Sequence, residues 1–336
     1  MTPGLSPLAV SIGDPAGVGP ELIAEAWATR EREGLPPFAA IGGIRLLAAA
    51  AASRGLALPI EPIASLDEAA DVFGRALPVL GALDGRWRPG EPDDDGAALA
   101  LASLERATAL SIAGDAGGLV TGPIAKSLLA AVGFHFPGQT EYVAHACGVA
   151  AQGAVMMLAG PRLRTIPLTV HVALAKVPGM ISVELIRRRV RIAADALRRD
   201  FGIERPRIAV AALNPHAGED GRMGDEEIRI IAPAITALAG EGLAVSGPHP
   251  ADALFTPHAR RNFDVAVCMY HDQALIPLKA LDFDNGVNVT LGLPIVRTSP
   301  DHGTAFDIAG TGTANPGATI AAIRMAGECA ARRALV

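Results

Sequence analysis

Short apolar runs alternate along the chain with longer segments in which apolar residues return every three or four positions. The short runs are typical of buried strands, and the longer segments are typical of amphipathic helices. Strands are predicted at Leu8–Ile12, Phe38–Ile41, Gly118–Thr121, Val155–Leu158, Thr165–Val172, Arg207–Leu213 and Val265–Tyr270. Helices are predicted at Pro20–Ala28, Gly43–Arg54, Gly96–Ile112, Ser182–Asp200, Asp225–Ala239 and Ala318–Ala330. This alternation favours an α/β fold with a largely parallel sheet.

The chain has 336 residues, which is more than one hydrophobic core usually holds. Because domains of roughly 100–200 residues are common, two domains are expected. No low-complexity linker separates two halves, so we expect the domains to share sheet or to exchange chain segments. The acidic stretch PGEPDDDG, at 89–96, is predicted to be an exposed loop that leads into a helix N-terminus.

Hydrophobic residues make up 50% of the chain and charged residues 19%, which is typical of a globular protein. The net charge is −6 and no basic block lies next to aromatic residues, so a nucleic-acid surface is not expected. The arginine-rich run at 187–199 follows helical periodicity and is interpreted as a solvated helix face whose first turn begins after Ser182 as N-cap.

The three cysteines, Cys147, Cys268 and Cys329, lie far apart and show no CxxC spacing. A disulfide framework and a thiolate zinc site are therefore not expected. The cysteine pattern instead favours a reducing compartment. The first residues show no basic leader followed by a long apolar core, and apolar runs such as 46–52 are too short to cross a bilayer of about 30 Å. We therefore expect a cytoplasmic protein with no membrane segment.

Three of the predicted strands lead into a histidine, in PLTVH at His171, VAALNPH at His216 and VCMYH at His271. The carboxyl ends of parallel strands share one rim of a sheet, where ligands bind. Neutral imidazoles suit zinc and other first-row metals, and three protein ligands leave coordination positions open. The pattern therefore predicts a metal site, which would also suit a zinc hydrolase. The alternative is that each histidine only closes its strand with a backbone hydrogen bond.

The stretch from 278 to 317 is rich in Gly, Thr, Asn and Asp, a composition that suits backbone in close approach to a ligand. Lys279 and Arg297 are cations suited to a phosphate or carboxylate, or to the surface. Asn288 is predicted to bond a substrate or a strand edge. The glycines of SIGDPAGVGPEL lie between a predicted strand and a predicted helix. A turn of this kind either binds an anion at the helix N-terminus or is only a tight connection without a ligand.

Eight stretches complete the pattern: GDPAGVGPE, VTGPIAK, FPGQTEYVA, LNPHAGEDGRMGDEE, GPHPAD, YHDQALIPLK, GVNVTLGLPIVRTSPDHGTAFDIAG and TANPGA. They span nearly the whole chain, and in this order they resemble the 4-hydroxythreonine-4-phosphate dehydrogenase family of pyridoxal phosphate biosynthesis. The resemblance implies a two-domain α/β/α fold like that of isocitrate and isopropylmalate dehydrogenases. We expect residues 1–140 and 290–336 to form the domain with the cofactor loops, and residues 141–289 to carry the metal ligands and dimer contacts.

The activity that the resemblance implies is oxidation of 4-phosphohydroxy-L-threonine at its secondary alcohol by NAD or NADP, with decarboxylation to 3-amino-2-oxopropyl phosphate. The family's divalent metal, which could be Zn, Mg, Mn or Co, would be held by His171, His216 and His271. Its substrate contacts fall on Thr140, Lys279, Asn288 and Arg297. By analogy with the related dehydrogenases, the cofactor candidates are His302, Asp307 and Asn315.

Family members are homodimers with a shared active site in the interdomain cleft, and His271 is the expected ligand from the partner. The family usually has PGHTE where this chain has PGQTE, so Gln139 replaces a substrate-contacting histidine. Glutamine cannot carry a proton, which indicates either a neutral hydrogen bond or a different substrate, such as a related four-carbon sugar-acid phosphate. Asp252 and Asp272 are candidate bases, or carboxylates that orient a metal-binding histidine. A protein that only binds a metabolite would be favoured by the loss of a metal ligand, and none of the three is missing.

Overall fold

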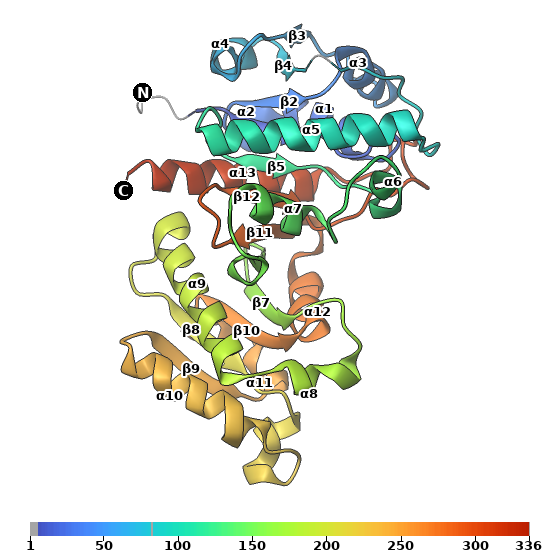
Figure 1. Cartoon of the computed structure of the whole chain (residues 1–336). Helices are drawn as coiled ribbons and strands as arrows, with labels where there is room; N and C mark the ends of the chain where they lie inside the picture. The colour runs from blue at the N-terminus through green and yellow to red at the C-terminus, as the bar shows by residue number, and fades with distance from the viewer. Residues whose placement is uncertain (1–5, 82, 336) are drawn as a thin grey trace. The chain divides into compact units, whose positions relative to one another are not determined.

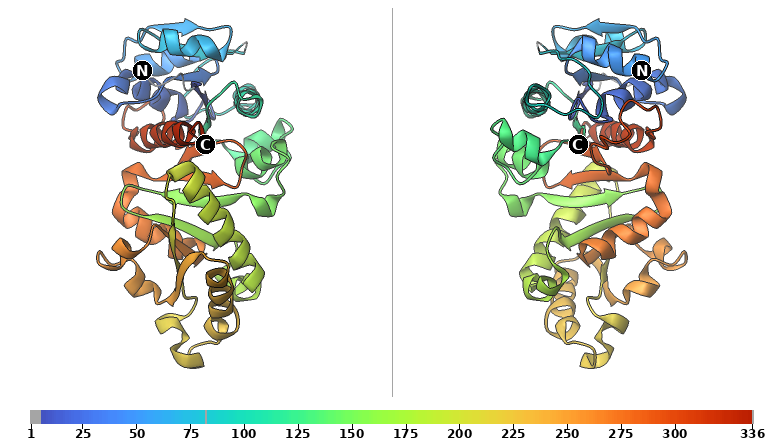
Figure 2. Two further views of the ribbon diagram at one scale, coloured as in Figure 1. Left: turned by 90° about the vertical axis from the view of Figure 1, so that its left-hand side faces the viewer. Right: turned by 90° about the vertical axis from the view of Figure 1, so that its right-hand side faces the viewer.

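The computed structural model describes residues 6–81 and 83–335. The chain divides into two compact units, where we expected a division at 140/141 and 289/290 (Figure 1). Unit 1 comprises Met1–Ala154 and Leu293–Val336, and unit 2 comprises Val155–Gly292. Two further views show the red C-terminal helix within the same unit as the blue N-terminal segments (Figure 2). Segments from both ends of the chain therefore build unit 1.

Unit 1 is a parallel sheet covered by helices. Its strands stand in the order β3-β4-β2-β1-β5-β12, and each described pairing among them is parallel. The strands are β1 (Leu8–Ser11), β2 (Phe38–Ile41), β3 (Ile60–Pro62), β4 (Leu77–Leu80), β5 (Leu119–Thr121) and β12 (Arg297–Pro300). The helices are α1 (Gly19–Ala28), α2 (Arg30–Glu33), α3 (Ile44–Ser53), α4 (Ala69–Phe73), α5 (Asp94–Ala113), α6 (Lys126–Ala131), α7 (Gln139–Ala146) and α13 (Gly317–Arg333).

The core of unit 1 lies around its central strands. Every residue of β1, β2 and β4 is buried, which explains their nearly continuous apolar sequences, because helices cover a parallel sheet on its faces. Helix α5 packs on β1, β2 and β5. It is long and apolar enough to cross a membrane by length and composition, but half of its apolar window is buried in the structure, as in a core helix.

Unit 2 is a mixed sheet in the order β11-β6-β7-β10-β8-β9. The strands β7, β10, β8 and β9 are parallel to one another, whereas β6 pairs antiparallel with both β7 and β11. The strands are β6 (Val155–Ala159), β7 (Arg164–Thr169), β8 (Arg207–Ala211), β9 (Ala244–His249), β10 (Val265–Tyr270) and β11 (Val287–Leu291). The helices are α8 (Val177–Met180), α9 (Val183–Phe201), α10 (Ala232–Gly240), α11 (Ala251–Leu254) and α12 (His271–Asp282).

The predicted cap of α9 is confirmed, because the Ser182 hydroxyl accepts a hydrogen bond from the Leu185 backbone N–H at 3.1 Å. The arginine face of this helix is partly exposed. Arg187 and Arg191 both form ion pairs with Glu241, and these two guanidinium groups lower the pKa of Glu241 to about 2. The run was interpreted as a solvated helix face, and the structure agrees only in part, because the Nε atoms of Arg187, Arg188 and Arg189 are buried.

Several predicted boundaries were wrong. The strand predicted to run to Val172 ends at Thr169, and the one predicted to run to Leu213 ends at Ala211. The helix predicted over 225–239 is two elements, a π-helical turn, η5 (Glu227–Ile231), followed by α10. His271 does not end a strand but begins α12. Pattern alone cannot place these ends, because tertiary hydrogen bonds decide where each strand stops.

Candidate functional site

The three histidines follow three neighbouring strands of unit 2. The order β7-β10-β8 places the strand before His271 between the strands that precede His171 and His216. His171 lies two residues after β7, His271 begins α12 directly after β10, and His216 lies in a tight turn, η4 (Pro215–Gly221), after β8. The topology therefore brings all three histidines to one rim of the sheet, as the sequence predicted.

Buried side chains fix the ends of these strands against one another. The Thr169 hydroxyl donates to the Met269 carbonyl at 2.9 Å, which ties the end of β7 to β10. The Gln273 amide accepts from the Met269 N–H at 2.7 Å and donates to the Ala212 carbonyl at 2.8 Å, which ties α12 to the segment after β8. Sequence reasoning missed Thr169 and Gln273, although both lie within two residues of a candidate ligand.

His171 and His271 lie side by side. Their ring centroids are 5.8 Å apart, and both side chains line a pocket of about 240 Å³. The His271 Nδ1 atom lies 2.8 Å from an Asp272 carboxylate oxygen, so Asp272 orients the ring and leaves Nε2 for a ligand. The lining residues are Thr169, His171, Val172, Leu174, Val177, Tyr270, His271 and Asp272.

The turn around His216 has an unusual backbone. Residues 216–220 all have positive φ, and four of the five are not glycine. His171 also has a positive φ, of 53°. A left-handed conformation costs roughly 1–2 kcal/mol for a residue with a Cβ atom, so the surrounding structure must hold these residues in place. The two candidate ligands with strained backbone are thus placed by tertiary contacts rather than by local preference.

A buried carboxylate lies inside the His216 turn. Glu227, on η5, accepts hydrogen bonds from the backbone N–H groups of Leu213 and Asn214, both at 2.8 Å, and from the Asn214 side-chain amide at 2.9 Å. Glu227 is only 3% exposed. These bonds fix the two residues that precede Pro215 and His216, and sequence reasoning did not single out this carboxylate.

The donor set suits a divalent cation only in part within one chain. Imidazole nitrogens are ligands for zinc and other first-row metals, and the His171 and His271 rings share one pocket. Across residues 6–81 and 83–335, however, no three His, Cys, Asp or Glu side chains are close enough together to hold a metal ion. His216 therefore does not complete a three-ligand group with the other two in the single chain. Asp252 is exposed on α11, which contacts η4.

Unit 1 carries a buried cation at the start of β12. Arg297 is 3% exposed, and its guanidinium donates to the Thr121 hydroxyl at 2.8 Å, the Thr140 hydroxyl at 3.2 Å and the Gln139 carbonyl at 3.2 Å. Burial lowers the pKa of Arg297 to about 10, with a smaller opposing effect from the Glu141 carboxylate. Arg297 is therefore charged at neutral pH and lies inside the protein, so the alternative of a surface position is wrong for this residue.

Gln139 bridges this cation and the backbone. Its amide nitrogen donates to the Gly122 carbonyl at 2.9 Å, and its amide oxygen accepts from Arg297. A neutral acceptor beside a buried guanidinium avoids the repulsion that a protonated histidine would cause here. In the structure the Gln139 amide thus joins Arg297 to the backbone of Gly122.

Lys279 and Asn288 lie in unit 2. Lys279 is partly buried in the last turn of α12, on the same face as Asp272 and two turns further on. Asn288 lies on β11, opposite Leu158 of β6, so it is a strand residue. Its side-chain oxygen is buried and has no hydrogen-bond partner among the described residues. Because buried polar atoms are normally paired, this oxygen is a candidate contact for a ligand donor.

The loop with the cofactor candidates packs on the glycine-rich turn after β1. The Val18 N–H donates to the Thr304 carbonyl at 3.0 Å, and a Cβ atom on Gly17 would lie 2.6 Å from the same oxygen, which explains a glycine there. The Gly310 N–H donates to the buried Glu21 carboxylate at 3.3 Å. The turn thus holds the loop, and the alternative that the turn binds an anion by itself has no support from these contacts.

The three cofactor candidates differ in their surroundings. The Nε2 atom of His302 is buried and has no hydrogen-bond partner among the described residues, so it can contact a ligand. Asp307 is exposed, and the Asn315 side chain accepts from the Gly317 N–H at 2.9 Å at the start of α13. Nearby, Asp14 has one buried carboxylate oxygen with no partner in the described chain, and burial is the main cause that raises its pKa. Sequence reasoning missed Asp14, although it lies in the quoted GDPAG motif.

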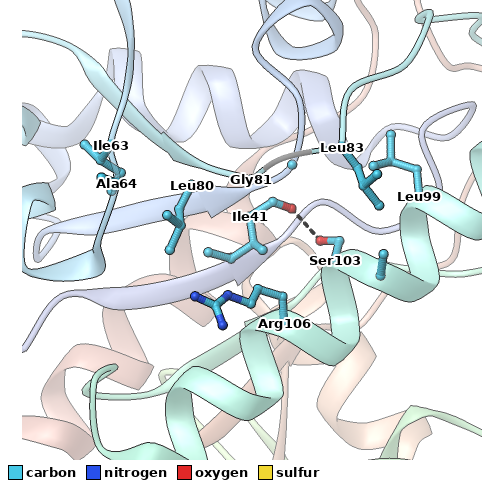
Figure 3. Close-up of a pocket in the computed structure, with 11 residues that line it drawn as sticks. Ile41, Ile63, Ala64, Leu80, Gly81, Leu83, Leu99, Ser103 and Arg106 are labelled. Atoms are coloured by element: carbon cyan, nitrogen blue, oxygen red, sulfur yellow. Dashed lines mark hydrogen bonds between the residues drawn. The ribbon is translucent and has the colours of Figure 1, made fainter.

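A larger pocket, of about 490 Å³, lies in unit 1 at the carboxyl ends of β2 and β4 (Figure 3). Its walls are mostly apolar, with Ile41, Leu80 and Leu99 among them. The Ser103 hydroxyl in the wall makes its hydrogen bonds within the protein, because it donates to the Ile41 carbonyl and accepts from the Ile12 N–H. Arg106 is exposed in the lining and is the one charged residue there, so this pocket lacks the several convergent polar groups of the sites described above.

Comparison with known proteins gives a consistent result. Residues 36–326 match the family model described as pyridoxal phosphate biosynthetic protein PdxA. The chain is 64% identical over 328 residues to a 4-hydroxythreonine-4-phosphate dehydrogenase of Erythrobacter litoralis, covering 98% of both chains. A crystal structure of the enzyme of that name from Klebsiella pneumoniae has a TM-score of 0.86 and 37% identity, covering 98% of this chain and 99% of the other.

A more distant structure is that of a terephthalate 1,2-cis-dihydrodioldehydrogenase from Burkholderia xenovorans, with a TM-score of 0.65 and 29% identity over 96% of this chain and 98% of the other. The predicted family, fold class and enzyme class are thereby confirmed, and the hydrolase alternative has no support among these relatives. The chain belongs to the PdxA family of pyridoxal phosphate biosynthesis, whose members named here are 4-hydroxythreonine-4-phosphate dehydrogenases, and it is an oxidoreductase.

Proposed function

We propose that the protein oxidises 4-phosphohydroxy-L-threonine at its secondary alcohol, with NAD or NADP as acceptor and a divalent metal ion, and that decarboxylation follows to give 3-amino-2-oxopropyl phosphate. The observation that carries this proposal is the pair of imidazoles, His171 and His271, in one pocket with Asp272 on the Nδ1 atom of His271. The names of the relatives at high identity support the substrate.

His171, His216 and His271 would hold the divalent ion, which could be zinc, magnesium, manganese or cobalt. When bound, such an ion supplies Lewis-acid chemistry toward the alcohol and the later carbonyl. Asp272 orients His271 through Nδ1, because a carboxylate engaged at 2.8 Å is better placed to fix a ring than to accept a substrate proton. Asp252 remains the candidate for removal of the hydroxyl proton, since its side chain is exposed on an element that contacts η4.

The substrate's anionic groups would be recognised by fixed donors. Arg297 offers a buried positive charge held by Thr140 and Gln139, a geometry suited to phosphate or carboxylate. Lys279 adds a second cation, and the buried Asn288 side-chain oxygen would accept from a substrate N–H or O–H donor.

The nicotinamide cofactor would be held by the loop that carries His302, Asp307 and Asn315. The buried Nε2 atom of His302 supports a hydrogen bond to the cofactor at this point of the loop. When bound, NAD or NADP supplies the hydride acceptor.

A homodimer with a shared active site would supply the third imidazole. Two observations support it: the described single chain groups no three ligands, and the pocket of His171 and His271 is bordered by the apolar side chains of Val172 and Leu174, which are 36% and 64% exposed. His271 was expected to come from the partner. Its place beside His171 makes His216 an equally good candidate for the cross-subunit ligand. We further propose a cytoplasmic enzyme with neither nucleic-acid nor membrane partners.

The test is a substrate panel followed by the absorbance of reduced nicotinamide. 4-Phosphohydroxy-L-threonine should be turned over in the presence of a divalent metal, and the matching four-carbon sugar-acid phosphates should be poor substrates. His216→Ala should abolish turnover and leave the circular dichroism spectrum unchanged, whereas His258→Ala, at an exposed position, should have no effect. Faster turnover of a sugar-acid phosphate would reassign the substrate, and full activity of His216→Ala would remove His216 from the metal site.

A further inference from the structure

We propose that Glu227 is a positioning residue for the metal site: its carboxylate places the His216 imidazole by holding the start of the η4 turn. The inference rests on the proposed role of His216 as a metal ligand. It concerns a residue that does not touch the metal or the substrate and that nothing in the comparisons assigns.

The hydrogen bonds of Glu227 converge on the segment that leads into the turn. One carboxylate oxygen accepts the backbone N–H groups of Leu213 and Asn214, both at 2.8 Å, and the other accepts the Asn214 side-chain amide at 2.9 Å. Only Pro215, whose ring restricts φ, separates Asn214 from His216. The backbone segment that links the Glu227 contacts to His216 is therefore short and has restricted conformational freedom.

The far side of the turn also closes on Glu227. A Cβ atom on Gly218 would lie 2.7 Å from a Glu227 oxygen and 2.8 Å from the Gly224 carbonyl, so the turn passes directly over the carboxylate. Gly218 has a φ of +78° and is buried. His216 thus lies between two points, Asn214 and Gly218, that both pack against the same carboxyl group.

The charge of Glu227 is needed for this arrangement, because all of its partners in the turn are donors. In Glu227→Gln, an amide NH₂ group would replace one acceptor and face the Asn214 amide nitrogen. The Asn214 amide could rotate so that its oxygen accepts from the new donor. That oxygen would then face the Glu226 carboxylate, which in the parent accepts a hydrogen bond from the Asn214 amide nitrogen at 2.7 Å. The substitution therefore loosens the turn although it changes the side-chain volume very little.

Glu226→Gln is the matched control. It changes the neighbouring carboxylate in the same way, and Asn214 keeps both of its hydrogen bonds to Glu227, from the backbone N–H at 2.8 Å and from the side-chain amide at 2.9 Å. A general effect of charge removal near η4 would appear in both variants. An effect through the hydrogen bonds of Glu227 to Leu213 and Asn214 would appear only in Glu227→Gln.

The experiment is a titration of the full-length, metal-free protein with Co²⁺ alone, followed by the visible ligand-field absorption of the bound ion. We expect Glu227→Gln to weaken Co²⁺ binding by about tenfold or more and to change the absorption spectrum toward fewer nitrogen ligands, and we expect the same direction of change for His216→Ala. Glu226→Gln should match the parent. Loss of general stability alone would lower the folded fraction without changing the spectrum of the ion that remains bound.

Asn214→Ala provides a second variant if Glu227→Gln does not fold. It removes the hydrogen bond from the Asn214 side chain to Glu227 and leaves the two backbone hydrogen bonds to that carboxylate. We expect a smaller loss of Co²⁺ affinity, of about threefold to tenfold. Parent-like affinity and spectrum in the folded Glu227 or Asn214 variant, together with a changed His216→Ala, would overturn this inference alone. An unchanged His216→Ala would instead overturn the proposed metal site and this inference with it.

Discussion

The buried guanidinium of Arg297 allows function and stability to be separated. In Arg297→Met the side chain keeps much of its volume but loses its hydrogen bonds to Thr121, Thr140 and Gln139. Hydrogen bonds to a charged group contribute about 1.5–3 kcal/mol each when one partner is removed. The substitution also removes the cost of burying a charge, which is several kcal/mol for a residue that is only 3% exposed.

These two effects on the free energy of unfolding have opposite signs and similar sizes. We therefore expect Arg297→Met to change stability by no more than about 2 kcal/mol. Recognition of an anionic substrate group has no such compensation. Loss of a desolvated charged contact costs about 3 kcal/mol, which corresponds to a fall in kcat/KM of about 100-fold.

The assay combines urea unfolding with steady-state oxidation of 4-phosphohydroxy-L-threonine. Arg324→Met is the control, because Arg324 is partly exposed and pairs with Glu33 at 2.8 Å, a structural contact within unit 1. It should leave kcat/KM unchanged. If Arg297→Met keeps its kcat/KM but loses more than about 4 kcal/mol of stability, Arg297 is a structural residue and the reasoning about anion recognition is wrong.

Two further predictions concern protonation. Gln139→His places an imidazole beside the Arg297 guanidinium, whose positive charge lowers the pKa of the ring below its ordinary value of about 6.5. Activity should therefore fall only at pH values below about 6.5, as the ring takes up a proton next to a fixed positive charge; superimposable pH profiles for variant and parent would contradict this. Burial raises the folded-state pKa of Asp14 above its ordinary value of 3.8, so the contribution of Asp14 to stability is fully present below pH 3.8 and is lost as pH rises through the folded pKa. Asp14→Asn should remove this loss and be more stable than the parent at pH 7 in thermal unfolding, and a less stable variant would show that the Asp14 charge supports the fold.

Most uniformly buried strands could be predicted from the sequence, but β4, which is buried throughout, was missed. The cores of β1, β2 and β10 are apolar throughout because helices cover their sheets, and their pattern identifies them without other information. β12 and β9 were missed because their sequences, RTSP and AVSGPH, contain proline and polar residues. The polar start of β12 is tolerated because Arg297 finds partners inside the protein.

That the three histidines lie at one rim of the sheet could also be predicted, but their order along it and the geometry of each could not. A positive φ at His171 and His216 has no signature in the sequence, since neither position is a glycine. Glu226 and Glu227 are adjacent and identical in type, and only the fold distinguishes the half-buried carboxylate from the buried one that holds the turn. Tertiary hydrogen bonds decide both features, and local patterns do not record them.

The most direct test of the account is the metal dependence of nicotinamide reduction. The protein is freed of metal with a chelator, given 4-phosphohydroxy-L-threonine with NAD or NADP, and followed by the absorbance of the reduced cofactor before and after stoichiometric addition of a divalent ion. The account predicts no turnover without the ion and full recovery with it. Turnover at the same rate in the metal-free protein would contradict the proposal that the three histidines serve the reaction through a bound cation.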